Sequence, residues 1–394
     1  MDSKRAKILI NYQEPDYLRI KNAKLNSKFQ ITIIAIVFYA IFVINFYIII
    51  VEKESAVLLL FTGGTISMSE DPATGALRPI DFDRLQEYMP ELKQTGIRIK
   101  SIPFLPLIDS SDVHPPVWER MAMIIQEHYD DFDGFVILHG TDTMAYTASA
   151  MSFMLENLSK PVIFTGAQLP IGMMRSDAKE NLLTAIEIAT AEENGQPIVP
   201  EVCIFFEDTL FRGNRTTKKN AEHFSAFNSY NYPPLAKAGV HIKYFRSYIH
   251  YPAAGTSLRV RTKVDQNIAI LKLFPGISEQ TVNAILNIPE LKAVVLESFG
   301  AGNAPRRTWF YNALKDATDR GILIVNKTQC STGSVEMGRY ETSLNLVNAG
   351  VMSAYDCTTE AIVTKLMHLL GEFDSLDDIK HRLSVSLCGE MTVS

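Results

Sequence analysis

Short apolar runs recur along the chain, and several end in glycines, hydroxyls or carboxylates. The first run begins at residue 56 and leads into a Thr-Gly-Gly-Thr turn at residues 62–65. A continuous apolar run is typical of a strand buried on both faces, as in a parallel sheet covered by helices. Gly63 and Gly64 can adopt backbone angles closed to other residues and let a ligand approach the main chain. We therefore expect Thr65 just past the carboxyl end of a strand, where open α/β sheets bind ligands.

The apolar runs alternate with segments of helical periodicity. This alternation predicts right-handed βαβ units, each adding a strand to one parallel sheet. We expect strands at residues 56–61, 97–107, 134–138, 162–165 and 201–206, and then at 268–273, 293–296 and 322–325. We expect helices at residues 82–89, 115–128, 144–158 and 181–191, and then at 279–286, 358–370 and 376–383.

The alternation of strands and helices stops after residue 206 and starts again at residue 268, which predicts two domains. A polar, proline-containing stretch at residues 246–266 is expected to link them. The predicted fold is α/β, with a larger N-terminal parallel-sheet α/β domain (residues 55–245) and a smaller C-terminal α/β domain (residues 267–394). Residues 1–54 form an N-terminal extension outside both domains.

The extension contains an apolar segment at residues 29–51. At about 20 residues it is long enough to cross a bilayer as a helix. Lysines and arginines before it would keep the N-terminus in the cytosol and the body on the other side. That orientation would expose the sequon at Asn214 to glycosylation. This conflicts with a catalytic role for the same segment, which contains the candidate base Lys218. Alternatively, the extension is not part of the mature protein, because its composition resembles translated non-coding sequence.

Charge and cysteine spacing exclude some function classes. The formal net charge of -6, with no long basic run after the extension, argues against a nucleic-acid partner. The four cysteines are far apart and form no Cys-x-x-Cys pair, so neither a metal site nor a disulfide framework is indicated. We expect free thiols in a reducing compartment.

The polar residues at the strand ends suggest a nucleophile and its base. The candidates are Thr65, Thr141 with Asp142, and Lys218. A threonine hydroxyl needs a neighbouring base to become a nucleophile, and a lysine can be that base. The backbone N–H groups of the two glycines before Thr65 could stabilise an oxyanion. We interpret His139, at the end of an apolar strand, as structural. These residues alone favour a hydrolase or transferase acting on a small polar molecule.

Three segments carry a family resemblance. Residues 62–66 (Thr-Gly-Gly-Thr-Ile) and 139–143 (His-Gly-Thr-Asp-Thr) resemble the two signature motifs of the bacterial-type L-asparaginase family. Residues 213–218 (Gly-Asn-Arg-Thr-Thr-Lys) are similar to the lysine-bearing motif of its type I, cytosolic and animal-like branch. The resemblance covers the body of the chain and excludes the extension.

The resemblance implies hydrolysis of L-asparagine to L-aspartate and ammonia through an acyl-enzyme, without a cofactor. Thr65 would be the nucleophile, assisted by Thr141, Asp142 and Lys218. The implied substrate-binding residues are Gly64, Ser110, Ser111, Asp142 and, from a neighbouring subunit, Asn303. Family members are homotetramers built as dimers of dimers and are cytoplasmic, which leaves a membrane anchor at residues 29–51 as an added expectation.

Two further positions follow from the resemblance. Many family members use a tyrosine in a lid loop, but residues 67–79 contain none. Tyr340 resembles the tyrosine that related animal enzymes use instead. Allosteric activation by asparagine in type I relatives involves positions that match Thr217 and Cys330.

Two other functions stay open. The same chemistry would serve a glutaminase or a broader primary-amide amidohydrolase. Without its lid tyrosine, the protein could instead bind or sense asparagine without turning it over.

Overall fold

The computed structural model describes residues 36–39, 54–70, 77–79, 82–338 and 341–393. The chain divides into two units, residues 1–53 and residues 54–394. In the first unit, residues 36–39 form a helical turn, and the rest of the predicted span at residues 29–51 lies outside the described residues. Within the described ranges, no helix combines the length and apolarity needed to cross a membrane.

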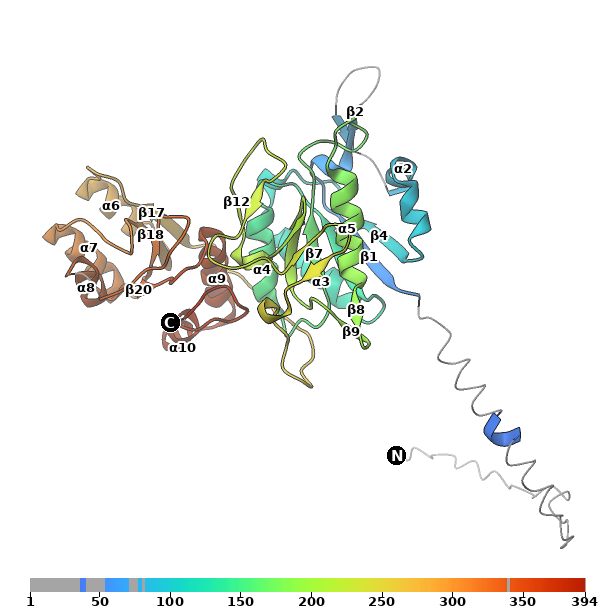
Figure 1. Ribbon diagram of the computed structural model, residues 1–394. Helices are drawn as coiled ribbons and strands as arrows, with labels where there is room; N and C mark the ends of the chain where they lie inside the picture. Colours follow the sequence, from blue (N-terminus) through green and yellow to red (C-terminus); the bar gives the residue numbers. More distant parts are fainter. Residues whose placement is uncertain (1–35, 40–53, 71–76, 80–81, 339–340, 394) are drawn as a thin grey trace, which may run out of the picture. The chain divides into compact units, whose positions relative to one another are not determined.

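The second unit contains an eight-stranded sheet with the order β15-β14-β11-β10-β7-β5-β1-β4 (Figure 1). Its strands are β1 (Ala56–Phe61), β4 (Arg98–Pro103), β5 (Gly134–Leu138), β7 (Val162–Thr165), β10 (Val202–Phe206), β11 (Thr209–Arg212), β14 (Ala236–Lys237) and β15 (Lys243–Tyr244). Its helices are α2 (Phe82–Tyr88), α3 (Pro115–Glu127), α4 (Met144–Met154) and α5 (Ala178–Thr190).

The strands of this sheet are buried on both faces because alternate residues enter different cores. Leu58 and Leu60 of β1 pack with α3 and α4, whereas Val57 and Leu59 pack with α2 and α5. Every residue of β1 is buried. The continuous apolar runs in the sequence are explained by this two-sided cover.

A smaller parallel sheet follows, with the order β17-β18-β19-β20. Its strands are β17 (Ile268–Lys272), β18 (Ala293–Ser298), β19 (Leu323–Thr328) and β20 (Met352–Ser353). Its helices are α6 (Glu279–Leu286), α7 (Thr308–Asp319), α8 (Glu341–Asn348), α9 (Thr359–Glu372) and α10 (Leu376–Leu383). Helix α9 packs against α4 of the larger sheet (Figure 1).

The remaining described elements are short two-stranded sheets and 3-10 turns. The pairs are β2 (Met68–Glu70) with β3 (Leu77–Pro79), β6 (Leu155–Glu156) with β16 (Arg259–Val260), β8 (Glu192–Glu193) with β9 (Gln196–Pro197), and β12 (Thr217–Lys218) with β13 (Phe227–Asn228). The turns are η2 (Thr65–Ser67), η3 (Pro90–Gln94), η4 (Ser110–Asp112), η5 (Gly213–Arg215) and η6 (Arg246–Tyr248).

The predicted two-part α/β fold is confirmed, but the larger sheet is not wholly parallel. Strands β11, β14 and β15 pair antiparallel at one edge. Only Glu207 and Asp208 separate β10 from β11, and Glu207 has a φ of 60°. Two-residue turns join antiparallel strands, whereas parallel strands need a long crossover. The predicted domain boundaries at residues 245 and 267 stay predictions.

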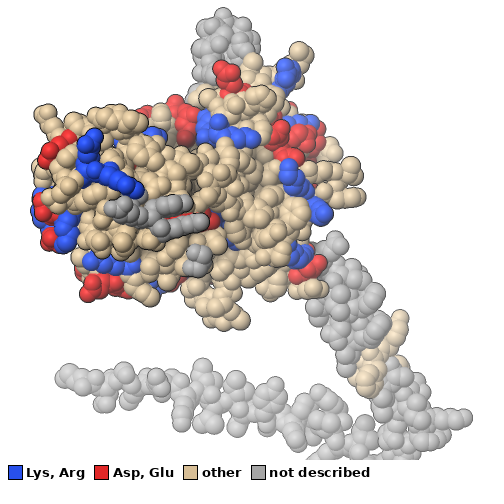
Figure 2. Space-filling model, turned by 60° about the vertical axis from the view of Figure 1, so that its left-hand side comes forward, with Lys and Arg blue, Asp and Glu red and all other residues tan. Residues whose placement is uncertain are grey.

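Charged side chains of both signs are interspersed on the face shown in Figure 2. Neither sign dominates the described part of that face, in keeping with the low net charge of the chain.

Candidate active site

The turn after β1 is tied to the end of the neighbouring strand β5. Thr62 donates two hydrogen bonds to the carbonyl oxygen of Leu138, from its backbone nitrogen at 3.1 Å and from Oγ1 at 2.8 Å. Both strands therefore end at the same place, and the segments that follow them lie side by side. One continues to Thr65 and the other to Thr141.

Glycines allow these two segments and a third one to touch. Gly64 has a φ of 83°, and a Cβ placed on it would lie 2.5 Å from the Cα of Gly140. A Cβ on Gly140 would in turn lie 2.5 Å from the Oγ of Ser110. No real Cβ tolerates such distances, so neither position accepts a side chain without displacing the chain around it. The predicted residues Gly64, Ser110 and the Thr141 segment are thus brought together.

Lys218 reaches the same segment from β12. Its Nζ lies 2.8 Å from the Oγ1 of Thr141 and 2.6 Å from the Oδ1 of Asp142. The Lys218 side chain is 17% exposed and that of Asp142 is 64% exposed. The next strand anchors this arrangement, because Phe227, paired with Lys218 in the β12–β13 ladder, is buried. Hydroxyl, amine and carboxylate thus meet as the sequence predicted.

Gln168 is a member of this cluster that the sequence analysis missed. Thr141 donates from Oγ1 to the Oε1 of Gln168 at 3.3 Å, and Gln168 donates from Nε2 to the carbonyl oxygen of His223 at 3.0 Å. Gln168 follows β7, the strand next to β5, by only three residues. Its position after a central strand was the signal that could have identified it.

Ser110 and Ser111 begin the 3-10 turn η4, and Asp109 caps that turn. The Asp109 carboxylate accepts hydrogen bonds from the backbone nitrogen and the Oγ of Ser111, both at 2.9 Å. These bonds, the backbone one first, lower the pKa of Asp109. Ser110 is buried, and its carbonyl oxygen accepts a 2.6 Å bond from Thr143. The two serines are held beside the Thr141 segment.

His139 is buried in the core next to the site. Its Nδ1 lies 2.7 Å from the carbonyl oxygen of Gly140, and its Nε2 lies 3.0 Å from the Oγ1 of Thr147. Trp118 also donates to that hydroxyl, at 3.2 Å. Burial lowers the pKa of His139 to about 4. The imidazole is therefore neutral at pH 7 and bonded to core groups, as expected of a structural histidine.

The described hydrogen bonds of the Thr141 cluster do not include the remaining predicted site residues. Thr65 is half-buried and directly follows Gly64, which contacts Gly140. Asn303 lies in a turn after β18, where its backbone nitrogen donates to the carbonyl oxygen of Phe299 at 2.7 Å. Its described contacts do not join it to Thr141 or Lys218. Tyr340 lies outside the described residues.

Thr217 and Cys330 line one cavity of about 340 Å³, together with residues of β17, β18 and β19. Thr217 donates from Oγ1 to the Oε1 of Glu360 at 2.5 Å. Lys272 and Lys327 line the same cavity, and burial lowers the pKa of Lys327. The cavity therefore carries both carboxylate and ammonium groups within reach of a small molecule.

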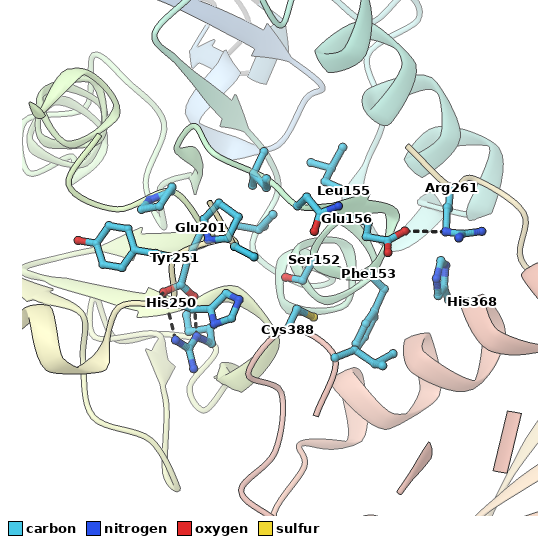
Figure 3. A pocket seen from close by; sticks show the side chains of 18 of the residues that line it. Ser152, Phe153, Leu155, Glu156, Glu201, His250, Tyr251, Arg261, His368 and Cys388 are labelled. Atoms are coloured by element: carbon cyan, nitrogen blue, oxygen red, sulfur yellow. Dashed lines mark hydrogen bonds and ion pairs between the residues drawn. The ribbon is translucent and has the colours of Figure 1, made fainter. Parts of the chain in front are cut away.

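A larger cavity, of about 470 Å³, contains none of the predicted site residues. It is lined by the end of α4, the start of β10 and parts of α9 (Figure 3). Glu156 pairs with Arg261 at 2.8 Å at one end, and Glu201 pairs with Arg212 at 2.6 Å at the other. Size alone would have pointed to the wrong site.

Known proteins are similar to this chain along most of its length. The family models described as "Asparaginase, N-terminal" and "Glutaminase/Asparaginase C-terminal domain" match residues 56–250 and 267–383. L-asparaginase 1 of Escherichia coli (strain K12) is 44% identical over 346 residues, covering 86% of this chain and 99% of that protein. The 60 kDa lysophospholipase of Homo sapiens is 41% identical over 364 residues, covering 87% of this chain and 62% of that protein.

A solved structure agrees with these relatives. L-asparaginase I from Vibrio cholerae O1 biovar eltor str. N16961 superposes with a TM-score of 0.78 at 40% identity, covering 86% of this chain and 100% of that one. The matches span both sheets and include Thr141, Gln168 and Lys218. The chain belongs to the asparaginase family.

Proposed function

We propose that this protein is an L-asparaginase, which hydrolyses L-asparagine to L-aspartate and ammonia. The observation that carries the proposal is the contact of Lys218 Nζ with Thr141 Oγ1 at 2.8 Å and with Asp142 Oδ1 at 2.6 Å. An amine in contact with a hydroxyl at a strand end is the arrangement needed to move a proton during nucleophilic attack on an amide.

In the proposed reaction, the hydroxyl of Thr65 attacks the side-chain carboxamide carbon of asparagine. Its proton passes through the Thr141 and Lys218 group to the departing ammonia, which leaves an aspartyl ester on Thr65. Water then cleaves this ester and releases aspartate. Backbone N–H groups of the turn at Gly63 and Gly64 are suited to stabilise the oxyanion that forms in each step.

Asp142 has a second part in this proposal. Its exposed carboxylate would bind the α-ammonium of the substrate, while Ser110 and Ser111 would contact the α-carboxylate. A substrate ammonium would therefore compete with Lys218 for the same carboxylate. We further propose that Asn303 reaches this site from a second copy in a homotetramer, and that Tyr340 assists Thr65.

The first test is ammonia release by the purified full-length protein. We expect Thr65→Ala and Thr141→Val to lower kcat for asparagine by at least about a hundredfold while the protein stays folded. Thr190→Val is a matched control, because that threonine bonds only to carbonyl oxygens of its own helix α5. Retention of most activity in both site variants would contradict the mechanism.

Two alternative functions predict other outcomes, one in the ammonia assay and one in calorimetry. A kcat/KM for glutamine that equals or exceeds that for asparagine would identify a glutaminase or a broader primary-amide amidohydrolase. Calorimetric binding of asparagine without ammonia release would identify a binding or sensing protein. The identities above favour the asparaginase, because the L-asparaginase 1 relative aligns over 99% of its own length.

We also propose that the cavity at Thr217 and Cys330 is an allosteric site for asparagine. The acidic and basic groups that line it suit a zwitterionic amino acid. If so, the dependence of rate on asparagine concentration is sigmoidal, and Glu360→Gln makes it hyperbolic. A hyperbolic dependence in the unaltered protein would contradict this proposal.

The cellular location is a separate proposal. We propose a cytoplasmic enzyme, and the alternative is a protein anchored in a membrane through residues 29–51. Carbonate extraction of membranes distinguishes the two, because an anchored protein stays with the pellet and a free one is found in the wash.

A further inference from the structure

A buried ion pair organises the segment after α10. The Nζ of Lys365, on α9, lies 2.7 Å from the Oε1 of Glu390, and both side chains are 0% exposed. The Glu390 carboxylate also accepts bonds from the backbone nitrogens of Leu387 and Cys388 at 2.9 Å. The Glu390 carboxylate therefore fixes the backbone just before it. We refer to residues 386–392, which include Glu390, as the 386–392 turn.

The 386–392 turn bonds to the segment just before Lys218. Asn214 donates from Nδ2 to the carbonyl oxygen of Cys388 at 3.1 Å. Arg215 donates from Nε to the carbonyl oxygen of Gly389 at 2.7 Å, and from Nη2 to the Oγ1 of Thr392 at 3.1 Å. Asn214 and Arg215 are buried within η5. Figure 3 shows Cys388 of this turn close to Ser152 and Phe153 of α4.

A second carboxylate closes the contact from the other side. Asp356 pairs through Oδ2 with the Nη1 of Arg215 at 2.9 Å, and its Oδ1 accepts a 2.7 Å bond from the backbone nitrogen of Thr392. Arg215 is therefore held by both the 386–392 turn and the chain after β20. Only two residues separate Arg215 from Lys218, and the backbone that reaches the lysine is extended in β12.

We propose that the 386–392 turn is a positioning element for Lys218, with Arg215 and Glu390 as its positioning residues. They do not touch the reacting atoms. They set the distance between Lys218 and Thr141, which a proton transfer requires to be within hydrogen-bond reach. The kinetic part of this inference rests on the proposed asparaginase function, whereas the structural part does not.

Gly389 gives a way to displace the turn without altering a bonding side chain. Its φ is 81°, and a Cβ on it would lie 2.4 Å from the Nη1 of Arg212. Gly389→Ala should therefore force the turn and the Arg212 side chain, which directly precedes η5, apart. Gly321→Ala is the matched control, because Gly321 has a φ of 91° but a Cβ there would meet nothing within 4 Å. Both variants place an alanine at a positive φ, but only Gly389→Ala meets a neighbouring side chain.

In the full-length protein, we expect Gly389→Ala to lower kcat for asparagine by about tenfold with KM changed less than twofold, because misplacing a catalytic group slows the chemical step. The pH dependence of kcat should shift as well, since Lys218 moves relative to Asp142. Gly321→Ala should keep the kcat and the pH profile of the unaltered protein. A Gly389→Ala protein that is folded and has an unchanged kcat and pH profile would overturn the inference.

A readout independent of activity separates this inference from the proposed function. Reductive methylation with formaldehyde, followed by peptide mass spectrometry, measures how readily the Lys218 amine reacts. We expect faster methylation of Lys218 in Gly389→Ala than in Gly321→Ala, with Lys179 as an internal reference on the surface. Faster methylation in a protein that never releases ammonia would contradict the asparaginase and support the positioning role. Equal methylation of Lys218 in the two variants would contradict the positioning role.

Discussion

Two lysine–carboxylate pairs in this chain have nearly the same length but different surroundings. Lys218 and Asp142 are 2.6 Å apart with side chains 17% and 64% exposed, whereas Lys365 and Glu390 are 2.7 Å apart and fully buried. The first pair opens to solvent, and its lysine also contacts the hydroxyl of Thr141. The second is surrounded by backbone groups of the 386–392 turn. Distance alone therefore does not separate the pair that we propose to be catalytic from the buried one, whereas exposure and neighbours do.

Burial also changes what removal of a partner costs. An exposed ion pair contributes little to stability because water solvates both charges. A buried pair loses that solvation, so the removal of one member leaves the other charged and uncompensated. We expect the Lys218 pair to affect the reaction and the Lys365 pair to affect the stability of the fold.

The largest expected effect is on the reaction. Lys218→Met should lower kcat by about a thousandfold, because it removes the group that accepts the proton. The free energy of unfolding should change by less than about 1 kcal/mol. Steady-state ammonia release and urea unfolding measure the two quantities. Lys219→Met, at the next position, should leave both nearly unchanged, and a similar loss of kcat there would break the comparison.

Removal of the buried lysine should mainly destabilise the protein. Lys365→Met leaves Glu390 buried without its cation, which should lower the free energy of unfolding by about 3–5 kcal/mol. Lys179→Met is the control, because its pair with Glu91 at 2.5 Å is about two-fifths exposed on both sides. That variant should lose much less stability than Lys365→Met in urea unfolding, because water solvates both charges of the exposed pair. Equal losses in the two variants would show that burial does not distinguish these pairs.

A double variant tests whether the uncompensated charge of Glu390 causes the loss of stability in Lys365→Met. Lys365→Met with Glu390→Gln removes both charges but keeps an amide oxygen that can accept bonds from Leu387 and Cys388. We expect it to regain about 2 kcal/mol relative to Lys365→Met alone, because the uncompensated charge is gone. Chemical denaturation of all variants at one pH gives the coupling energy. No regain would mean that Lys365 acts through packing alone.

The smallest effect is the dependence on pH. Burial by itself would raise the pKa of Glu390, but Lys365 and the hydrogen bonds outweigh it and hold the pKa below its ordinary value. A carboxylate with a lowered pKa stabilises the folded state above the unfolded pKa of about 4.3, and this contribution is lost as the pH falls through the folded pKa. Thermal unfolding from pH 6 to pH 3 should show a shallower decline in the double variant. Parallel declines would contradict this assignment.

The sequence predicted the central strands well because two-sided burial leaves continuous apolar runs. The run that forms β1 is one example, and the predicted helix at residues 279–286 matches α6 (Glu279–Leu286). The antiparallel edge was missed because β14 and β15 are two-residue strands whose pairing depends on tertiary contacts. The 386–392 turn was also missed, because a lysine and a glutamate in different elements give no periodic signal.

The candidate site was predicted as far as its motifs extend. Thr141, Asp142 and Lys218 belong to the two motifs at residues 139–143 and 213–218, which the family resemblance assigns to one site. The structure brings the three side chains into contact. Gln168 belongs to no such motif, and only the adjacency of β7 and β5 reveals it. The roles of Thr65, Asn303 and Tyr340 stay predictions.

The amide of Asn214 bears on how the chain could be modified. This asparagine stands in an Asn-Arg-Thr sequon, yet it is 0% exposed and donates to Cys388. An oligosaccharide could be attached there only before the surrounding chain folds, and its bulk would then keep residues 386–392 from docking. A sugar at this position and the bond between Asn214 and Cys388 are therefore mutually exclusive.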